Sequence, residues 1–365
     1  MNLHNARILI LKPSSLGDII HSLPLVHSLK RTWPDCHVGW VVQEAFAKIL
    51  ENDPTIDSVY QINIPSTSDP QSGKLAFVQA FRQTRRTLSK LKEVFGSNPY
   101  DLIFDLHGSF RSGLLGRANP DGKRFGFADA REFNTFFQDQ LIDVPPETVH
   151  ALEKNLLFCD QVGCSVTKED FFLSSGDAAG RRIKSLLGGY GVVPEDRLVY
   201  MHTTARWKTK FWFPERWAQV ADRLIDKSGV KVILGGSGDD REYISSIEAK
   251  MTKTPLVTAG RCSLAESAAL LSRCSVYVGL DSGPMHMAAM AGVPVVVLFG
   301  PTHPERVGPY GVEHVIVKGG NLDCLGCRKR ACNKMACMDS IPVDMVYDAT
   351  VRLLELRKNQ NGPVL

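Results

Sequence analysis

The sequence predicts an α/β protein made of two Rossmann-like halves. Short apolar runs alternate with amphipathic stretches of helical length along most of the chain. Most of these runs end in a polar or glycine-containing turn, as strands of an open parallel sheet do where they meet a ligand. The length of 365 residues also exceeds what one hydrophobic core ordinarily organises, so we expect two domains.

The apolar runs divide into two sets of predicted strands. The first half contains runs at 8–11, 37–42, 58–62 and 101–106, and the second half contains runs at 198–202, 230–234, 276–280 and 293–298. Glycines and one proline cluster between 174 and 196, which indicates a domain boundary there. A last helix is predicted over about 343–358.

Composition limits the classes of function. Hydrophobic residues make up 44% of the chain, and its mean hydropathy of −0.09 is typical of a soluble globular protein. No apolar window approaches the roughly 20 residues of a membrane helix, and the apolar run at the N-terminus is too short for a signal peptide. We therefore expect a cytoplasmic protein.

Positive charge is concentrated in the first half. Between Lys74 and Arg131 there are 11 Lys or Arg residues against 5 Asp or Glu, although the whole chain carries only +4. Within a predicted helix over 75–92, Arg82, Arg86 and Lys90 are spaced four apart and Arg85 lies beside them, which forms a basic ridge. A solvated face is the usual explanation of such a ridge. The regional excess favours an anionic partner instead, whether nucleic acid, a phosphorylated substrate or lipid headgroups.

The turn at 281–286, Asp-Ser-Gly-Pro-Met-His, follows a predicted buried strand and opens a helix rich in small residues. Turns of this kind present backbone N–H groups and the positive end of a helix to an anion, most commonly a phosphate. The turn therefore predicts a nucleotide or sugar-nucleotide site.

The segment 12–18, Lys-Pro-Ser-Ser-Leu-Gly-Asp, lies between the first strand and the first helix. Asp18 stands at the helix start, where the helix dipole favours an ionised carboxylate that is able to accept a proton from an attacking hydroxyl. The alternative is a helix-capping aspartate with no part in chemistry. Gly17 allows a ligand to approach the backbone. We assign Ser15 and Gly17 to the binding of the molecule that carries the attacking hydroxyl.

Two loops of the second half carry groups suited to a nucleotide. The loop 202–214 combines hydroxyls with Arg206, Lys208 and Lys210, which suit phosphate oxygens, although a solvated basic loop is the alternative. The glycine turn 235–242 offers acids for ribose or sugar hydroxyls, but a lone glycine turn is weak evidence and helix-start acids explain most of these carboxylates.

Four of the nine cysteines cluster near the end of the chain, at positions Cys324, Cys327, Cys332 and Cys337. Their number suits a structural zinc ion or an iron–sulfur cluster. Their spacing is not that of a paired CxxC ribbon, so reduced thiols in a compact loop are the stronger interpretation.

Four motifs together resemble the glycosyltransferase family that contains the lipopolysaccharide heptosyltransferases, glycosyltransferase family 9. They are Lys-Pro-Ser-Ser-Leu-Gly-Asp at 12–18, Ile-Ile-His-Ser-Leu-Pro at 19–24, the turn at 281–286, and Leu-Phe-Gly-Pro-Thr at 298–302. The segments 40–47 and 126–132 look more like heptosyltransferase I than heptosyltransferase II.

The resemblance implies a GT-B fold, in which two Rossmann-like domains face each other across a cleft. Residues 1–175 would bind the acceptor, residues 176–342 would bind the sugar nucleotide, and a C-terminal helix within 343–365 would pack back toward the first domain. The implied reaction is an inverting, metal-independent transfer of heptose from ADP-heptose to a Kdo sugar of Kdo-lipid A. We expect a monomer without a nucleic-acid partner, in peripheral contact with the inner face of the inner membrane.

The resemblance also implies roles for individual residues. Asp18 would be the general base, and Lys210 would neutralise the leaving diphosphate in place of a metal. The donor would be held by Thr203, Thr204, Lys208, Asp240, Asp281, Ser282, Gly283 and His286, with Glu242 as a weaker alternative to Asp240. The acceptor would contact Arg131 together with Ser15, Gly17 and the ridge residues Arg82, Arg85 and Arg86.

Two departures from the family pattern leave alternatives open. The family commonly has Lys-x-Trp-Pro, whereas Phe213 intervenes here between Trp212 and Pro214, so Lys208 rivals Lys210 for the phosphate role. Ser282 stands where relatives often have threonine, which keeps the hydroxyl. Heptosyltransferase II is the nearest alternative function, and a sugar-nucleotide sensor is the non-enzyme alternative. A dehydrogenase is disfavoured because the first strand turn lacks Gly-x-Gly-x-x-Gly.

Overall fold

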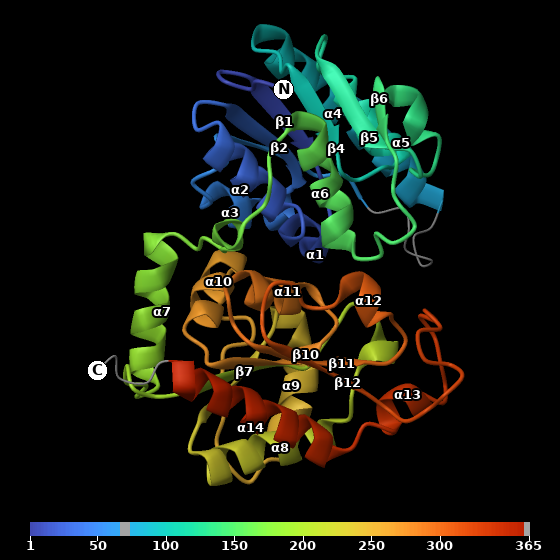
Figure 1. Cartoon of the computed structure of the whole chain (residues 1–365). Helices are drawn as coiled ribbons and strands as arrows, with labels where there is room; N and C mark the ends of the chain where they lie inside the picture. Colours follow the sequence, from blue (N-terminus) through green and yellow to red (C-terminus); the bar gives the residue numbers. More distant parts are fainter. Residues whose placement is uncertain (66–73, 361–365) are drawn as a thin grey trace. The chain divides into compact units, whose positions relative to one another are not determined.

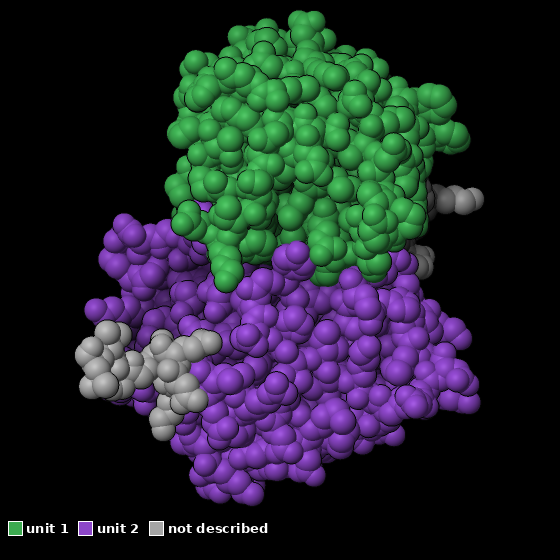
Figure 2. Space-filling view, viewed as in Figure 1, with its two compact units in different colours: residues 1–171 green, residues 172–365 purple. Residues whose placement is uncertain are grey.

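The computed structural model describes residues 1–65 and 74–360, which divide into two compact units, residues 1–171 and 172–365 (Figure 2). Each unit is built on a parallel sheet with helices packed against it (Figure 1). Within the described residues, no helix combines the length and the apolar character that crossing a membrane requires.

The first unit contains a sheet of six described strands in the order β3-β2-β1-β4-β5-β6. Its strands are β1 Arg7–Leu11, β2 His37–Gln43, β3 Ser58–Ile62, β4 Leu102–Asp105, β5 Lys123–Phe127 and β6 Gln140–Ile142. Its helices are α1 Leu16–Ile20, α2 Leu23–Thr32, α3 Glu44–Glu51, α4 Lys74–Ser97, α5 Phe110–Gly116 and α6 Ala151–Val162, with short 3-10 turns η1 Asn134–Phe137 and η2 Lys168–Asp170.

The second unit repeats this strand order around its own sheet, β12-β11-β10-β7-β8-β9. Its strands are β7 Leu198–His202, β8 Lys231–Gly235, β9 Leu256–Val257, β10 Val276–Leu280, β11 Val295–Phe299 and β12 His314–Lys318. Its helices are α7 Asp177–Gly189, α8 Pro214–Ser228, α9 Arg241–Glu248, α10 Leu264–Ser272, α11 Gly283–Met290, α12 Pro304–Val307, α13 Ala336–Asp339 and α14 Val343–Gln360, with 3-10 turns η3 Lys208–Lys210 and η4 Gly238–Asp240.

The strand order reverses direction once in each sheet, between β1 and β4 in the first unit and between β7 and β10 in the second. Open α/β sheets bind ligands outside the carboxyl ends of the strands at such a switch point, because the two connections leave toward opposite faces there. In the first unit Leu11 pairs with Asp105, and in the second His202 pairs with Gly279. The residues just after these pairs are therefore the ones that each fold offers to a ligand.

Central strands of both sheets are almost continuously apolar because helices cover them, as expected of a parallel sheet. Arg7–Leu11 is buried from its second residue onward, and Val276–Leu280 is buried throughout. In the second unit Trp212 and Trp217 pack edge to face with ring centroids 4.9 Å apart, and both rings are buried in the core. This pair anchors the end of the loop that joins β7 to α8.

All eight predicted strands are confirmed, and α4 and α14 occur where helices were predicted. The strands β5, β6, β9 and β12 were not predicted. Strands β6 and β9 have only three and two residues, and only one residue of β12 is buried, so these three strands give a weak apolar signal. Helix α14 packs against α8 and along β10, β11 and β12 of its own unit. Its return toward the first domain stays a prediction.

Candidate active site

Asp18 lies in the first turn of α1, directly after the end of β1. Its Oδ2 atom accepts hydrogen bonds from the Ser15 backbone N–H at 3.0 Å and from the Ser15 hydroxyl at 2.7 Å. This is a capping box in which Ser15 caps the helix and Asp18 bonds back to it. The predicted capping role is therefore present. It leaves Asp18 half-buried and its Oδ1 atom available to another group.

The electrostatic surroundings keep Asp18 ionised. Burial acts to raise the pKa of Asp18, but the charge of Lys12 and the hydrogen bonds from Ser15 outweigh burial and hold that pKa below its usual value. Lys12 is itself buried, and its Nζ donates to the Leu106 carbonyl at 2.5 Å. Burial lowers the pKa of Lys12, while the charges of Asp18 and Asp105 oppose that shift. Asp18 is thus an available but weakly basic carboxylate.

The neighbouring strand end supplies residues that the sequence analysis missed. Asp105, at the end of β4, is fully buried and accepts hydrogen bonds from the backbone N–H groups of His107 and Gly108, both at 3.0 Å. The side chains of Ser112 and Asn134 also donate to it, at 2.9 and 2.7 Å. Asp105 therefore organises this turn and has little capacity left for a ligand. Asp105 lies near the end of a predicted strand, and the position of that strand next to β1 is the feature that could have identified the turn.

His107 belongs to the same site as Asp18. Although His107 is exposed, desolvation of its ring by the surrounding residues and the positive charge of Lys12 lower its pKa, while the charges of Asp105 and Asp18 oppose the shift. A histidine in this state is neutral at pH 7 and is able to accept or donate a hydrogen bond without carrying charge. Arg131 is exposed, and its backbone N–H donates to the Gly108 carbonyl at 3.3 Å. The structure thus brings Arg131 to the turn that carries His107.

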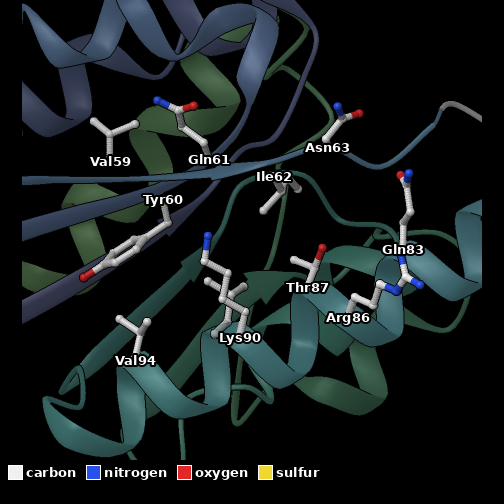
Figure 3. Close-up of a pocket in the computed structure, with 11 residues that line it drawn as sticks. Val59, Tyr60, Gln61, Ile62, Asn63, Gln83, Arg86, Thr87, Lys90 and Val94 are labelled. Carbon is white, nitrogen blue, oxygen red and sulfur yellow. The ribbon is translucent and has the colours of Figure 1, made fainter.

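Two of the four residues of the basic ridge line a groove. A groove of about 590 Å³ lies between β3, at the edge of the sheet, and α4, and Arg86 and Lys90 line it (Figure 3). Lys90 extends from α4 toward β3 in this view, whereas the amide of Gln83 points away from Arg86. Of the eleven described residues that line the groove, none is acidic. Arg82 and Arg85 are exposed on α4 and are not among those eleven residues.

At the switch point of the second unit, an ion pair joins the loop after β7 to the end of β10. Lys210 Nζ lies 2.7 Å from Asp281 Oδ2 and donates to the Asp281 carbonyl at 3.0 Å. Both side chains are largely buried, with 15% and 8% of their surface exposed. Lys208, in the same 3-10 turn, is exposed and is not part of this pair. The loop after β7 is therefore tied to the end of β10 through Lys210.

The start of α11 is the place where the sequence predicts an anion site. Ser282 is the residue that precedes the helix, and its hydroxyl donates to the Leu280 carbonyl at 3.2 Å. Gly283 is the first residue of the helix and follows Asp281 by two positions. Pro284 has no N–H, and the N–H of Met285 donates to the Ser282 carbonyl at 3.1 Å, so the Gly283 N–H is the group of this turn that we assign to an anion. His286 is buried one turn later. A phosphate beside this helix end would be stabilised by the helix dipole and by the adjacent lysine.

Three threonines lie in the loops that follow β7 and β11. Thr203 and Thr204 are buried directly after β7, and Thr302 follows β11. Within the described part of the chain, the hydroxyls of Thr203 and Thr302 are buried without a hydrogen-bond partner. Such an open hydroxyl costs free energy until a ligand or a water molecule satisfies it. From the sequence, Thr302 is part of the motif 298–302 and has no assigned role.

Asp240 is the predicted donor-side acid. Its Oδ2 accepts hydrogen bonds from the backbone N–H and the hydroxyl of Ser237, both at 2.7 Å, in a capping box before α9. The negative charge of Asp240 also acts on His202, whose pKa burial lowers to about 4 despite that charge. The alternative Glu242 is exposed on α9. Asp240 is therefore close to the end of β7, and its second carboxylate oxygen remains for a ligand.

The predicted metal site at the four cysteines is not supported. The residues that the structure describes contain no group of three or more His, Cys, Asp or Glu side chains arranged for a metal ion. Cys324, Cys327 and Cys332 are exposed on the segment after β12, whereas Cys337 is buried in the core of the second unit on α13.

Comparison with known proteins agrees with the fold and identifies the family. The model of glycosyltransferase family 9 (heptosyltransferase) matches residues 88–337. A lipopolysaccharide heptosyltransferase 1 from Pseudomonas aeruginosa is 30% identical over 340 residues, which cover 89% of this chain and 87% of that protein. A lipopolysaccharide heptosyltransferase 3 from Escherichia coli is 25% identical, and the match covers 93% of this chain and 95% of that protein.

Solved structures show the same architecture. A family 9 glycosyltransferase from Veillonella parvula aligns with a TM-score of 0.81 at 22% identity over 98% and 99% of the two chains. The ADP-heptose heptosyltransferase II of E. coli aligns with a TM-score of 0.74 at 20% identity over 96% and 99%. The two Rossmann-like units and these matches define a glycosyltransferase of the GT-B fold. The chain belongs to glycosyltransferase family 9, the heptosyltransferase family.

Proposed function

We propose that this enzyme is a heptosyltransferase I, which transfers L-glycero-D-manno-heptose from ADP-heptose to a Kdo sugar of the lipopolysaccharide inner core. The observation that carries the donor half of the proposal is the ion pair of Lys210 with Asp281 beside the start of α11. The 30% identity to a heptosyltransferase 1 over most of both chains supports the acceptor. An E. coli heptosyltransferase solved with ADP shares the fold, with a TM-score of 0.71.

The proposed reaction is a single displacement. Asp18 takes the proton of the acceptor hydroxyl as the hydroxyl oxygen attacks the anomeric carbon of heptose. The bond from that carbon to the diphosphate breaks on the opposite face, and ADP leaves with the bonding electrons. The configuration at the anomeric carbon is inverted. The proton remains on Asp18 until solvent removes it.

Charge that develops on the diphosphate is met by residues of the second unit. We assign Lys210 and the Gly283 N–H at the start of α11 to the leaving phosphates, where preorganised positive charge lowers the barrier most. Thr203, Thr204, Ser282 and His286 complete the donor site in this proposal. Asp240 would receive a hydroxyl of the ribose or the heptose through its free oxygen. Lys208 is the alternative phosphate ligand. No catalytic metal is required.

We assign the acceptor to the first unit. Ser15 and Gly17 belong to the segment that leads into Asp18, Arg131 lies at the turn that carries His107, and in this proposal His107 joins them as a neutral hydrogen-bonding group. The groove with Arg86 and Lys90 suits an anionic part of the acceptor, since phosphates and the Kdo carboxylate are negatively charged. Arg82 and Arg85 would serve long-range attraction. We propose that the enzyme is a cytoplasmic monomer that contacts the inner-membrane surface peripherally, and that the final helix reaches toward the first domain.

Other functions of the family remain to be distinguished. The alternatives are heptosyltransferase II, heptosyltransferase 3 or another family 9 sugar transferase, and the 25% identity to an E. coli heptosyltransferase 3 favours testing that acceptor too. The test is purified enzyme with ADP-heptose and either Kdo₂-lipid A or its heptosylated forms, with products identified by mass spectrometry. A single added heptose on Kdo₂-lipid A supports heptosyltransferase I. Transfer only to heptosylated acceptors identifies a later step, and ADP-heptose binding without any transfer favours the sensor.

A further inference from the structure

The cysteine-rich segment that failed as a metal site makes specific contacts with two loops of the donor side. We call residues 324–332, between β12 and α13, the strap, and residues 203–213, between β7 and α8, the lysine loop. In the sheet, β11 and β7 are the two neighbours of β10, whose end carries Asp281. The strap touches the loops that follow both of these neighbours.

The first contact is with the turn after β11. The backbone N–H of Gly326 donates to the Gly300 carbonyl at 2.9 Å, and that of Arg328 donates to the Pro301 carbonyl at 2.7 Å. Gly326 has a φ of +71°, and a Cβ atom there would lie 2.3 Å from the ring of His303. Only a glycine allows this approach without displacing the ring. The strap is thus fixed along the turn that carries Thr302.

The second contact is with the lysine loop. The hydroxyl of Thr209, a residue only 5% exposed, donates to the Lys329 carbonyl at 2.9 Å. Two cations lie near the ring of Trp207, with the Arg330 guanidinium carbon 5.1 Å and Lys210 Nζ 5.0 Å from its centroid. Trp207 directly precedes the 3-10 turn Lys208–Lys210, and Thr209 lies between its two lysines. The strap therefore contacts the lysine loop just before this turn and within it.

We infer that the strap positions Lys210, and that Thr209, Trp207 and Arg330 are positioning residues for the donor diphosphate. The identification of that ligand rests on the proposed function. The strap is anchored to the turn after β11 and restrains the loop after β7, so it limits how far Lys210 moves away from Asp281 at the end of β10. The lysine loop is also held by the buried Thr203 and Thr204 after β7, by Trp212 in the core and by the ion pair of Lys210 with Asp281. The strap adds a restraint beside the lysine itself, and a cation that is held in place keeps more of its affinity for a ligand than a mobile one.

Three variants test the strap, and the first readout is independent of any ligand. In T209V the loop loses its hydrogen bond to Lys329, in R330A it loses the cation on Trp207, and T209S restores the hydroxyl. Hydrogen–deuterium exchange of peptides over 203–213 should become several-fold faster in T209V and R330A and return toward wild type in T209S. The control is T350V, because Thr350 is a fully buried threonine of the same unit whose hydroxyl donates to the Val346 carbonyl at 2.7 Å, far along the chain from the strap.

The second readout is the affinity for ADP by calorimetry. We expect the dissociation constant to rise about fivefold in T209V, the change that loss of one net hydrogen bond of about 1 kcal/mol produces, and to stay near wild type in T209S and T350V. Unchanged exchange over 203–213 in both T209V and R330A would overturn the inference. If T209V does not fold, R330A decides, since it alters an exposed arginine. Failure of the wild-type enzyme to bind ADP would count against the proposed donor, while the exchange result would still decide on the strap.

Discussion

Lys210, in the loop after β7, and Asp281, at the end of the neighbouring strand β10, form a close, largely buried ion pair, with Nζ 2.7 Å from Oδ2. The pair has two consequences. It holds the ammonium at the start of α11, where an anion is expected to bind, and it means that a diphosphate must share Lys210 with Asp281. Lys208 has no such restraint among the described residues. This difference is the physical basis for assigning the diphosphate to Lys210.

Lys210→Ala should therefore lower kcat/KM for ADP-heptose about 10²–10³-fold, as loss of one preorganised charge on a leaving group does. Lys208→Ala is the matched control, since it removes the same charge two residues away, and its effect should stay below about fivefold. Steady-state kinetics with donor titration measures both. The reverse order of effects would assign the diphosphate to Lys208.

The groove predicts a division within the basic ridge. Reversing the two groove cations with R86E and K90E together should raise the KM for the lipid acceptor about tenfold and leave the donor KM unchanged. The matched control is R82E with R85E, which changes the same charge on the same helix outside the groove. Kinetics at two salt concentrations separates specific binding from long-range attraction, because exposed charges are screened. Equal effects of the two pairs would mean that the groove has no specific role.

The buried His202 predicts a pH dependence of stability. Burial lowers its pKa to about 4 in the folded protein, against about 6.5 in an unfolded chain. Because the folded state disfavours the protonated form, the contribution of His202 is complete above about pH 6.5 and is lost as pH falls toward about 4. The free energy of unfolding should decline over that range, and the decline should be shallower in His202→Asn. Parallel urea titrations of both proteins at several pH values measure this, and identical slopes would contradict the burial argument.

The exposed thiols should differ in reactivity. Backbone N–H groups of Met335 and Lys334, with the nearby charges of Lys329 and Lys334, lower the pKa of Cys332. Burial instead raises the pKa of Cys36 to about 11 and that of Cys274 to about 12. The thiolate is the reactive form, so iodoacetamide should modify Cys332 first. Cys324 and Cys327 are the matched controls, being exposed on the same strap. Mass spectrometry measures the modification rate at each thiol. Equal rates at all three exposed cysteines would contradict the prediction.

The sequence predicts the fold well because central parallel strands are apolar and end in polar turns. The residues beside the switch points could be identified on that ground: Asp18 follows β1, and the 281–286 turn follows β10. The sequence could not distinguish Lys210 from Lys208, because both are lysines of the same 3-10 turn. They differ only in which residues their side chains contact. The pairing with Asp281 is a contact over 71 positions.

The remaining differences have similar causes. His107 was missed because its importance depends on β4 lying next to β1, which only the strand order reveals. At the four cysteines, their spacing left a metal as the weaker alternative to reduced thiols, and it does not show that Cys337 is buried in the core. The ridge on α4 stays a prediction, and the structure adds that Arg86 and Lys90 line the groove while Arg82 and Arg85 are not among its described lining residues.

The central claim is that Asp18 is the base of a heptosyl transfer, and the most direct test is Asp18→Asn. Asparagine keeps the shape of the side chain and the ability to accept from Ser15, but it cannot take up a proton. We predict that transfer from ADP-heptose to Kdo₂-lipid A falls at least about 10²-fold in this variant, while ADP affinity and thermal stability stay near wild type. Transfer at the wild-type rate by Asp18→Asn would contradict the account.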